Sequence, residues 1–169
     1  MATAQEHLLD WLRDAHAMEQ QAEQMLQSFS ERIEHYPQLK TRIDQHIEET
    51  RWQQQQVENC IKRLGSSTST LKDIAGKLMA FGQGLSGVVM SDEVIKGAMS
   101  GYVFENMEIA SYTILSAAAE TVGDLETKRV VQEILAQEEA MAQWMLAHLP
   151  ELTTAFLTRA ETPDVEAKR

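Results

Sequence analysis

Two carboxylates, Glu105 and Glu108, lie three residues apart in the segment 102–112, which is otherwise mostly aromatic, aliphatic and small. Residues three apart share one face of a helix, and Tyr102 and Tyr112 fall on the same face. A face that buries these rings also buries both acids. Buried carboxylates are costly unless they are paired, protonated or bound to a metal, and two so close repel each other. The pair therefore predicts a partner, a proton or a metal ion between the two acids.

Further acids occupy matching positions in the other predicted helices. Glu19 interrupts an apolar stripe of the first helix, Glu49 lies in the polar middle of the second, and Glu138 fits the stripe of the last long helix better than Glu139. Each acid lies near the middle of its helix, so antiparallel packing brings them all to one level. The candidate metal ligands are Glu19, Glu49, Glu105, Glu108 and Glu138.

Carboxylates that converge from four helices on one buried point are typical of bundles that hold two iron or two manganese ions. In this hypothesis Glu19 and Glu138 are terminal ligands. Glu49 and one member of the Glu105/Glu108 pair bridge the two ions. With open coordination positions, such a site predicts oxygen or peroxide chemistry, such as iron oxidation or peroxide reduction by an oxidase- or peroxidase-type enzyme.

The histidine part of the usual di-metal pattern is missing. That pattern includes Glu-x-x-His on two helices. Here Trp52 follows Glu49 by three residues, whereas His46 precedes it by three and Gln53 follows it by four. Whether His46, Gln53 or Glu139 contributes to the site is left open by the sequence.

The elements that must position these acids are all helical. Thr3 and Glu6 form a capping box before the first apolar stripe, Pro37 suits the start of a second helix, and Gly65 and Gly123 suit helix ends. Pro150 ends the last long helix or starts a new turn. We expect an all-α, ferritin-like four-helix bundle, made of two antiparallel hairpins joined by a long crossover, plus a short C-terminal helix. The expected helices are 4–34, 37–64, 71–81, 92–122, 125–149 and 151–160, followed by a polar, frayed tail at 162–169.

Composition narrows the class of protein. The chain has 169 residues, 43% of them hydrophobic and 24% charged, which suits one domain spanning 1–169. Its formal net charge of −11 argues against binding to nucleic acid or to an anionic membrane, because both would repel it. The single cysteine excludes an internal disulfide, and no apolar run approaches a membrane span. A reduced, cytoplasmic setting is expected.

Several motifs resemble the YciE/YciF family of small bacterial ferritin-like proteins. They are Glu-Glu-Thr (48–50), Phe-Glu-x-x-Glu-Ile-Ala-Ser-Tyr (104–112) and Glu-Glu (138–139). The segments 10–19, 91–97 and 165–168 resemble the YciE branch in particular. The resemblance covers nearly the whole chain, and it implies a ferritin-like homodimer associated with stress responses.

Carried over residue by residue, the resemblance points to the same five acids, and it also exposes two departures. Many relatives place a histidine where this chain has Gln53, and another where it has Asn106. Amides coordinate metals more weakly than imidazole or carboxylate. An alternative is therefore a metal-free structural or stress-associated dimeric bundle that keeps the acids as a hydrated polar network. A third alternative, the subunit of an iron-storage cage, has no evident cage-forming feature in the chain.

Overall fold

The computed structural model describes residues 1–66 and 91–168. This part of the chain holds four α-helices and no β-strand. The expected helix at 71–81 lies outside the described residues, and the four long helices are confirmed. They are α1 (Ala4–Arg32), α2 (Pro37–Arg63), α4 (Glu93–Thr121) and α5 (Leu125–Glu161).

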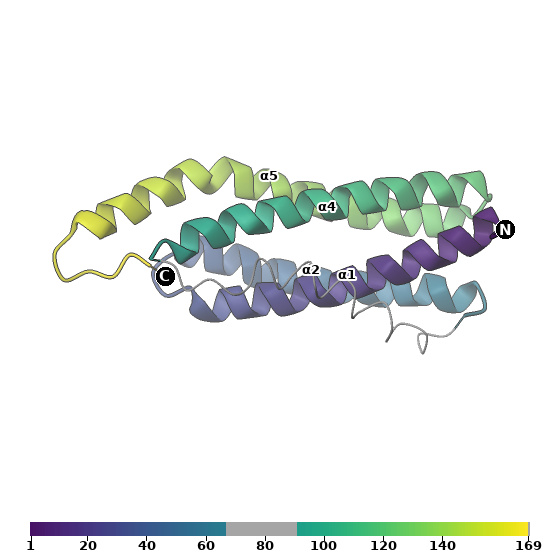
Figure 1. Ribbon diagram of the computed structural model, residues 1–169, viewed down its shortest axis with the longest axis horizontal. Helices are drawn as coiled ribbons and strands as arrows, with labels where there is room; N and C mark the ends of the chain where they lie inside the picture. The colour runs from purple at the N-terminus through teal and green to yellow at the C-terminus, as the bar shows by residue number, and fades with distance from the viewer. Residues whose placement is uncertain (67–90, 169) are drawn as a thin grey trace.

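The four helices lie side by side in an elongated bundle (Figure 1). At one end, Arg63, the last residue of α2, reaches Asp124 before α5 with an Nη2–Oδ2 distance of 2.7 Å. At the other end, Arg32 of α1 pairs with Glu93 of α4. Helices α2 and α4 therefore run in the same direction, and the described chain stops at one end of the bundle and resumes at the other. This is the ferritin-like arrangement of two hairpins.

The helix ends follow the sequence signals. Thr3 and Glu6 form the capping box, with Thr3 N donating to Glu6 Oε2 at 2.7 Å and Glu6 N donating to Thr3 Oγ1 at 3.2 Å. Gly65 and Gly123 follow α2 and α4 with φ angles of 78° and 77°, a region that favours glycine. Asp124 caps α5, because its Oδ1 accepts from Thr127 N at 3.1 Å.

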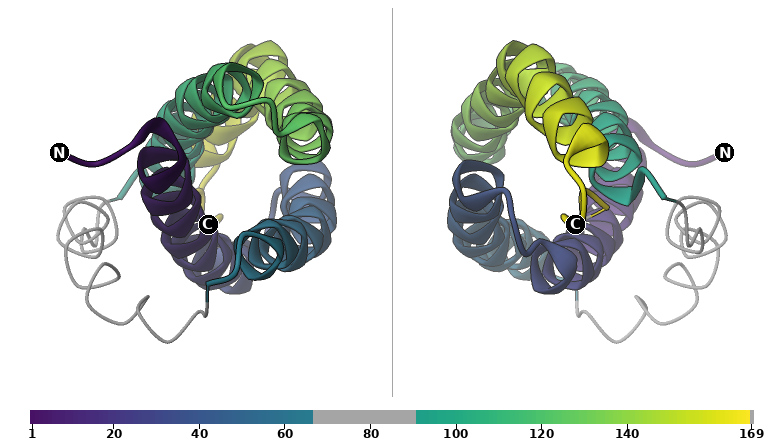
Figure 2. Two further views of the ribbon diagram at one scale, coloured as in Figure 1. Left: turned by 90° about the vertical axis from the view of Figure 1, so that its right-hand side faces the viewer. Right: turned by 90° about the vertical axis from the view of Figure 1, so that its left-hand side faces the viewer.

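The start of α4 and the chain's tail differ from the expectation. Asp92, expected to be the first residue of this helix, instead occupies the cap position, and its side chain makes no capping hydrogen bond. The carbonyl of Lys168 accepts from Val94 N at 3.1 Å instead, and Tyr36 Oη donates to Ala167 O at 2.6 Å. The tail through Lys168 is therefore folded back against this end of the bundle and not frayed (Figure 2). Its carbonyls give partners to a helix N–H and a buried hydroxyl.

A second correction concerns Pro150, which lies inside α5 and does not divide it into 125–149 and 151–160. Proline removes the hydrogen bond to the carbonyl four residues earlier. Here that carbonyl belongs to Leu146, a residue that is 52% exposed and so lies on the outer side of α5. Beyond the proline, Leu152 and Phe156 pack against an apolar cluster, which holds the last turns in place.

The core consists of two apolar clusters with a polar layer between them. One cluster includes Leu12, Ile61 and Leu115, and the other includes Ile43 and Met145. Each helix contributes to both clusters and carries buried polar residues between them. These are Glu19, His46, Thr50, Gln53, Glu105, Glu108 and Glu138. Among the described helices, none has a stretch that is both long and apolar enough to cross a membrane.

Candidate metal centre

The polar layer brings four potential metal ligands together from three helices. His46 comes from α2, Glu105 and Glu108 from α4, and Glu138 from α5. One ligand atom of each residue lies within 4.8 Å of the others, and no member of the group is more than 2% exposed. Imidazole nitrogen and carboxylate oxygen both suit iron and manganese. The group therefore has the donor atoms and the spacing to hold a metal.

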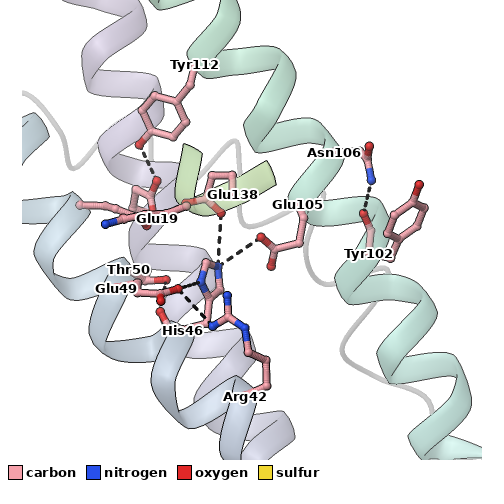
Figure 3. Close-up of polar contacts among 12 residues, drawn as sticks. Glu19, Arg42, His46, Glu49, Thr50, Tyr102, Glu105, Asn106, Tyr112 and Glu138 are labelled. Atoms are coloured by element: carbon pink, nitrogen blue, oxygen red, sulfur yellow. Dashed lines mark hydrogen bonds and ion pairs between the residues drawn. The ribbon is translucent and has the colours of Figure 1, made fainter. Parts of the chain in front are cut away.

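His46 contacts Glu105 and Glu138 of this group, and also Glu49 (Figure 3). Its Nε2 is 3.2 Å from Glu105 Oε2 and 3.3 Å from Glu138 Oε2. Its Nδ1 is 2.6 Å from Glu49 Oε2. The imidazole thus faces two buried acids with one nitrogen and a third acid, on its own helix, with the other.

The charges in the group are strongly coupled. Burial opposes charge on His46, but the negative charge of Glu105 and close contacts with Glu105, Glu138 and Glu49 outweigh it and raise the pKa of His46 to about 12. Burial raises the pKa of Glu105 to about 8 although His46 opposes this change. Burial and the charge of Glu138 raise the pKa of Glu108 well above its ordinary value. Without a cation, burial therefore favours the protonated, neutral forms of Glu105 and Glu108, and an ion bound here would replace those protons.

Glu19 completes the layer from α1. Its side chain is fully buried, and the hydroxyl of Tyr112 on α4 donates a hydrogen bond to its Oε1. Burial raises the pKa of Glu19 well above its ordinary value, and the charge of Glu138 adds to this effect. Glu19 therefore lies beside the four-residue group and interacts electrostatically with it.

Buried oxygens without a hydrogen bond are concentrated in this layer. Of the seven such side-chain atoms in the described residues, five belong to it. Native proteins leave few buried polar atoms without a partner, so their concentration in one place calls for a cation or ordered water. The five atoms are Glu19 Oε2, Gln53 Oε1, Glu108 Oε1, Glu105 Oε2 and Glu138 Oε2. The last two lie within ion-pair distance of His46 Nε2 but without the geometry of a hydrogen bond.

The structure does not bring Glu49 into the group, so this geometry does not support the bridging role expected for it. The Glu49 side chain is 23% exposed, and it accepts hydrogen bonds from Arg42 Nη1 at 3.2 Å and Gln45 Nε2 at 3.1 Å. The bond to His46 Nδ1 directs its carboxylate away from the other acids. The contact with His46 and the charge of Arg42 lower the pKa of Glu49 despite partial burial.

Burial distinguishes among the three residues whose contribution to the site the sequence left open. His46 and Gln53 are buried, whereas Glu139, next to the buried Glu138, is exposed. Gln53 Nε2 donates to Glu138, and also to Gln137 Oε1 at 2.9 Å. Asn106 is exposed and donates to Tyr102 O at 2.7 Å, so it has no part in the polar layer. The signal for His46 was its place on the same buried stripe as Gln53.

Comparisons with known proteins agree with this architecture. A family model described as "Domain of unknown function (DUF892)" matches residues 3–158. A solved protein from Xanthomonas campestris pv. campestris is 39% identical, with a TM-score of 0.80, over 95% of this chain and 100% of its own.

Two further solved structures are more distant in sequence. YcfI from Rhodopseudomonas palustris is 25% identical over 85% of this chain and 93% of its own, with a TM-score of 0.72. The E. coli stress protein YciF is 18% identical over 89% of this chain and 97% of its own, with the same TM-score, a likeness that shows the fold alone. The expected relationship to the YciE/YciF group is confirmed at the level of the family. This chain belongs to the DUF892 family, whose shared domain is one of unknown function.

Proposed function

We propose that this protein is a ferritin-like di-iron or di-manganese carboxylate protein. The observation that carries the proposal is the buried group of His46, Glu105, Glu108 and Glu138, with ligand atoms within 4.8 Å of one another and carboxylate oxygens that lack hydrogen bonds. Divalent cations satisfy such oxygens and balance their charge. Within the described residues, no hydrogen bond reaches Glu19 Oε2 or Glu108 Oε1.

Each residue has a role in this proposal. His46, Glu105, Glu108 and Glu138 bind the ions directly, and Glu19 is a terminal ligand from the α1 side, held by Tyr112. Glu49 positions His46 and is not a bridging ligand. The apolar clusters on both sides of the layer limit the entry of water. When bound, iron or manganese ions supply redox chemistry toward oxygen or peroxide, of the kind used in iron oxidation or peroxide reduction.

The wider setting is also a proposal. We assign the chain to the YciE branch, because the segments 10–19, 91–97 and 165–168 carry that resemblance. The E. coli relative YciF is a stress protein, which supports a role in a stress response. The net charge of −11 disfavours nucleic acid as a partner, and the lone cysteine suits a reduced cytoplasm. We further propose that the protein is a homodimer.

Thermal unfolding with and without added metal tests the metal proposal. A ligand that binds only the folded state raises the unfolding midpoint. Manganese(II), which avoids uncontrolled oxidation, is expected to raise the midpoint of the parent protein, and a chelator is expected to reverse the rise. The double variant Glu105→Gln with Glu108→Gln removes two carboxylates and is expected to show no rise. A midpoint in the parent that manganese and iron(II) both leave unchanged contradicts the proposal.

A second function, a metal-free structural bundle, has its own supporting observation. Gln53 donates to Glu138, and His46 contacts Glu105 and Glu138, so the acids already have some partners within the protein. For the relative YcfI a structural role has been suggested. This alternative predicts that neither manganese(II) nor iron(II) changes the unfolding midpoint. It also predicts that Glu105→Gln with Glu108→Gln leaves the assembly and its partners unchanged.

A further inference from the structure

The outward face of α4 is unusual in a protein of this charge. Between Gly97 and Ala119 the charged residues are Glu105 and Glu108, and both are buried. Every exposed position in that span is therefore uncharged, although 24% of the whole chain is charged and the net charge is −11. Met99, Val103 and Ile114 on this face are each more than half exposed. A helix that is apolar on its outer side as well as its inner side is typical of one covered by a partner.

The exposed residues of α4 follow a regular spacing. Alternate steps of three and four residues connect a row of eight exposed positions, an average of about 3.5 residues, which is the repeat that keeps one helix in contact with another along a seam. We call this row the α4 stripe. It consists of Lys96, Met99, Val103, Asn106, Ala110, Thr113, Ala117 and Glu120.

The α4 stripe is complementary to itself when it is read in the opposite direction. Its eight members form four pairs, and in each pair the two residue numbers average to 108. An antiparallel pair of α4 helices places a large side chain opposite a small one and a basic end opposite an acidic end. The pairs are Lys96 with Glu120, Met99 with Ala117, Val103 with Thr113, and Asn106 with Ala110.

We propose that the α4 stripe is the surface on which two copies of this chain pair, antiparallel, about a two-fold axis near position 108. A two-fold interface brings a surface against its own copy, so any charge near the axis faces itself. The absence of exposed charge between Gly97 and Ala119 removes that repulsion between two copies of net charge −11. A self-complementary stripe favours binding of a second copy of the same chain, and it does not favour binding of an unrelated partner.

Contacts within the chain fit this arrangement. The Asn106 amide near the axis donates to Tyr102 O at 2.7 Å, which meets part of its hydrogen-bonding need before any partner covers it. At the ends of the α4 stripe, Lys96 pairs with Asp92 and Glu120 pairs with Lys128. Pairing of two copies joins these into one charged network at each rim. The inference deepens the homodimer part of the proposed function and does not depend on the metal.

Cysteine cross-linking tests the direction and the register. A disulfide requires Cα atoms within about 7 Å. Val103→Cys and Thr113→Cys chains, tagged to differ in mass, are oxidised separately and after mixing by unfolding and refolding. In the proposed pairing, Val103 lies opposite Thr113 of the second copy. The Val103 residues of the two copies lie about 15 Å apart along the helix axis, and so do the two Thr113 residues. We expect a heterodimeric disulfide in the mixture and little in either variant alone.

The parent protein is the control for Cys60, which is buried. Efficient self-cross-linking of Val103→Cys indicates a parallel or shifted pairing and overturns the proposal. Absence of cross-linking in the mixture overturns it as well.

Sedimentation equilibrium tests the surface independently. The parent is expected to have twice the 19.1 kDa mass of one chain. Ala110→Glu puts two like charges near the axis and is expected to halve that mass, and so is Ala110→Lys. An equal mixture of the two variants is expected to recover the dimer, which shows that both still fold. Gln132→Glu, on the exposed side of α5, is the matched control and is expected to stay dimeric.

A monomeric parent overturns the proposal, and so does an Ala110→Glu variant that keeps the parent's mass. The metal content of Ala110→Glu separates this inference from the metal site. Normal metal content in a monomeric Ala110→Glu protein supports the stripe and the site together. If the parent protein is dimeric but binds no metal, the result contradicts the metal proposal and not the proposed dimer surface.

Discussion

Glu49 contacts His46 from behind, with its Oε2 2.6 Å from His46 Nδ1, while His46 Nε2 points toward the buried acids. In metal sites, a carboxylate on the far nitrogen of a ligating histidine fixes the tautomer and the direction of the ring. Arg42 and Gln45 in turn hold Glu49. A chain of contacts therefore leads from Arg42 and Gln45 to Glu49, from Glu49 to His46, and from His46 to the candidate metal position.

Replacing Glu49 separates positioning from direct ligation. Glu49→Ala is expected to weaken manganese(II) binding about 10–100-fold, the usual effect of losing the carboxylate partner of a ligating histidine. Glu105→Ala is expected to abolish binding at the same concentrations. Titration calorimetry measures both effects. The control is Glu48→Ala, next in sequence, whose exposed carboxylate pairs with Arg51 and is expected to have no effect. The positioning role is contradicted if Glu49→Ala binds manganese(II) as tightly as the parent does, or if it does not bind manganese(II) at all.

Tyr112 gives the Glu19 carboxylate its one hydrogen bond within the described residues, because Glu19 Oε2 has no such partner. Tyr112→Phe leaves a fully buried carboxyl group with neither oxygen bonded. We expect a loss of about 1–3 kcal/mol in the free energy of unfolding, measured with urea on the metal-free protein. Thr153→Val, on the exposed side of α5 and outside the α4 stripe, is the control, with an expected change of about 0.5 kcal/mol or less. Equal losses in the two variants contradict the account.

Glu108 is expected to oppose stability while serving metal binding. It is buried beside two other acids, and burial and the charge of Glu138 raise its pKa. Glu108→Gln keeps the shape, removes the charge and is expected to raise the free energy of unfolding of the metal-free protein by about 1 kcal/mol. The same variant is expected to lose the stabilisation that the parent gains from manganese(II). Thermal melts with and without the metal measure both changes. A metal-free variant less stable than the parent speaks against this trade-off.

Asp124 couples the α2 and α5 ends of the bundle and predicts a dependence on pH. Its Oδ1 and Oδ2 lie 2.7 Å from Arg63 Nη2. Partial burial opposes the charge, but Arg63 and Thr127 outweigh it and lower the pKa of Asp124. Because the folded pKa lies below the unfolded value, the stability from Asp124 is present above about pH 4 and is lost as the pH falls through the folded pKa.

Asp124→Asn keeps a capping side chain and removes the ion pair. It is expected to cost about 0.5–1 kcal/mol at pH 7 and close to nothing at pH 2. Urea unfolding at the two pH values measures the difference. Asp164→Asn is the control, because Asp164 is exposed and makes no ion pair within the described residues, and its φ of 61° also suits asparagine. A cost that stays the same at both pH values contradicts the role of the charge.

The buried acids could be predicted because helical periodicity decides which side chains face the core. Glu138 is buried and its neighbour Glu139 is exposed, as the apolar stripe of α5 indicates. The pair Glu105 and Glu108 is buried for the same reason. Helix starts and ends at Thr3, Pro37 and Gly123 depend on local backbone chemistry, so they too could be predicted from the sequence.

The difference between His46 and Glu49 could not be predicted. Both lie on the same broad side of α2, one turn apart, and a small rotation of the helix exchanges their positions. That rotation is set by contacts of Ile43 and Val57 with other helices, which are not local in sequence. The continuation of α5 through Pro150 and the docking of the tail at Val94 depend on distant partners in the same way.

The number of metal ions retained per chain tests the central claim most directly. Untagged protein is loaded with iron(II) without oxygen, desalted, and measured by mass spectrometry for metals, beside the Glu105→Gln with Glu108→Gln variant. The account predicts about two irons per chain in the parent and close to none in the variant. No retained iron in the parent, or equal iron in parent and variant, would contradict a di-metal site at these acids.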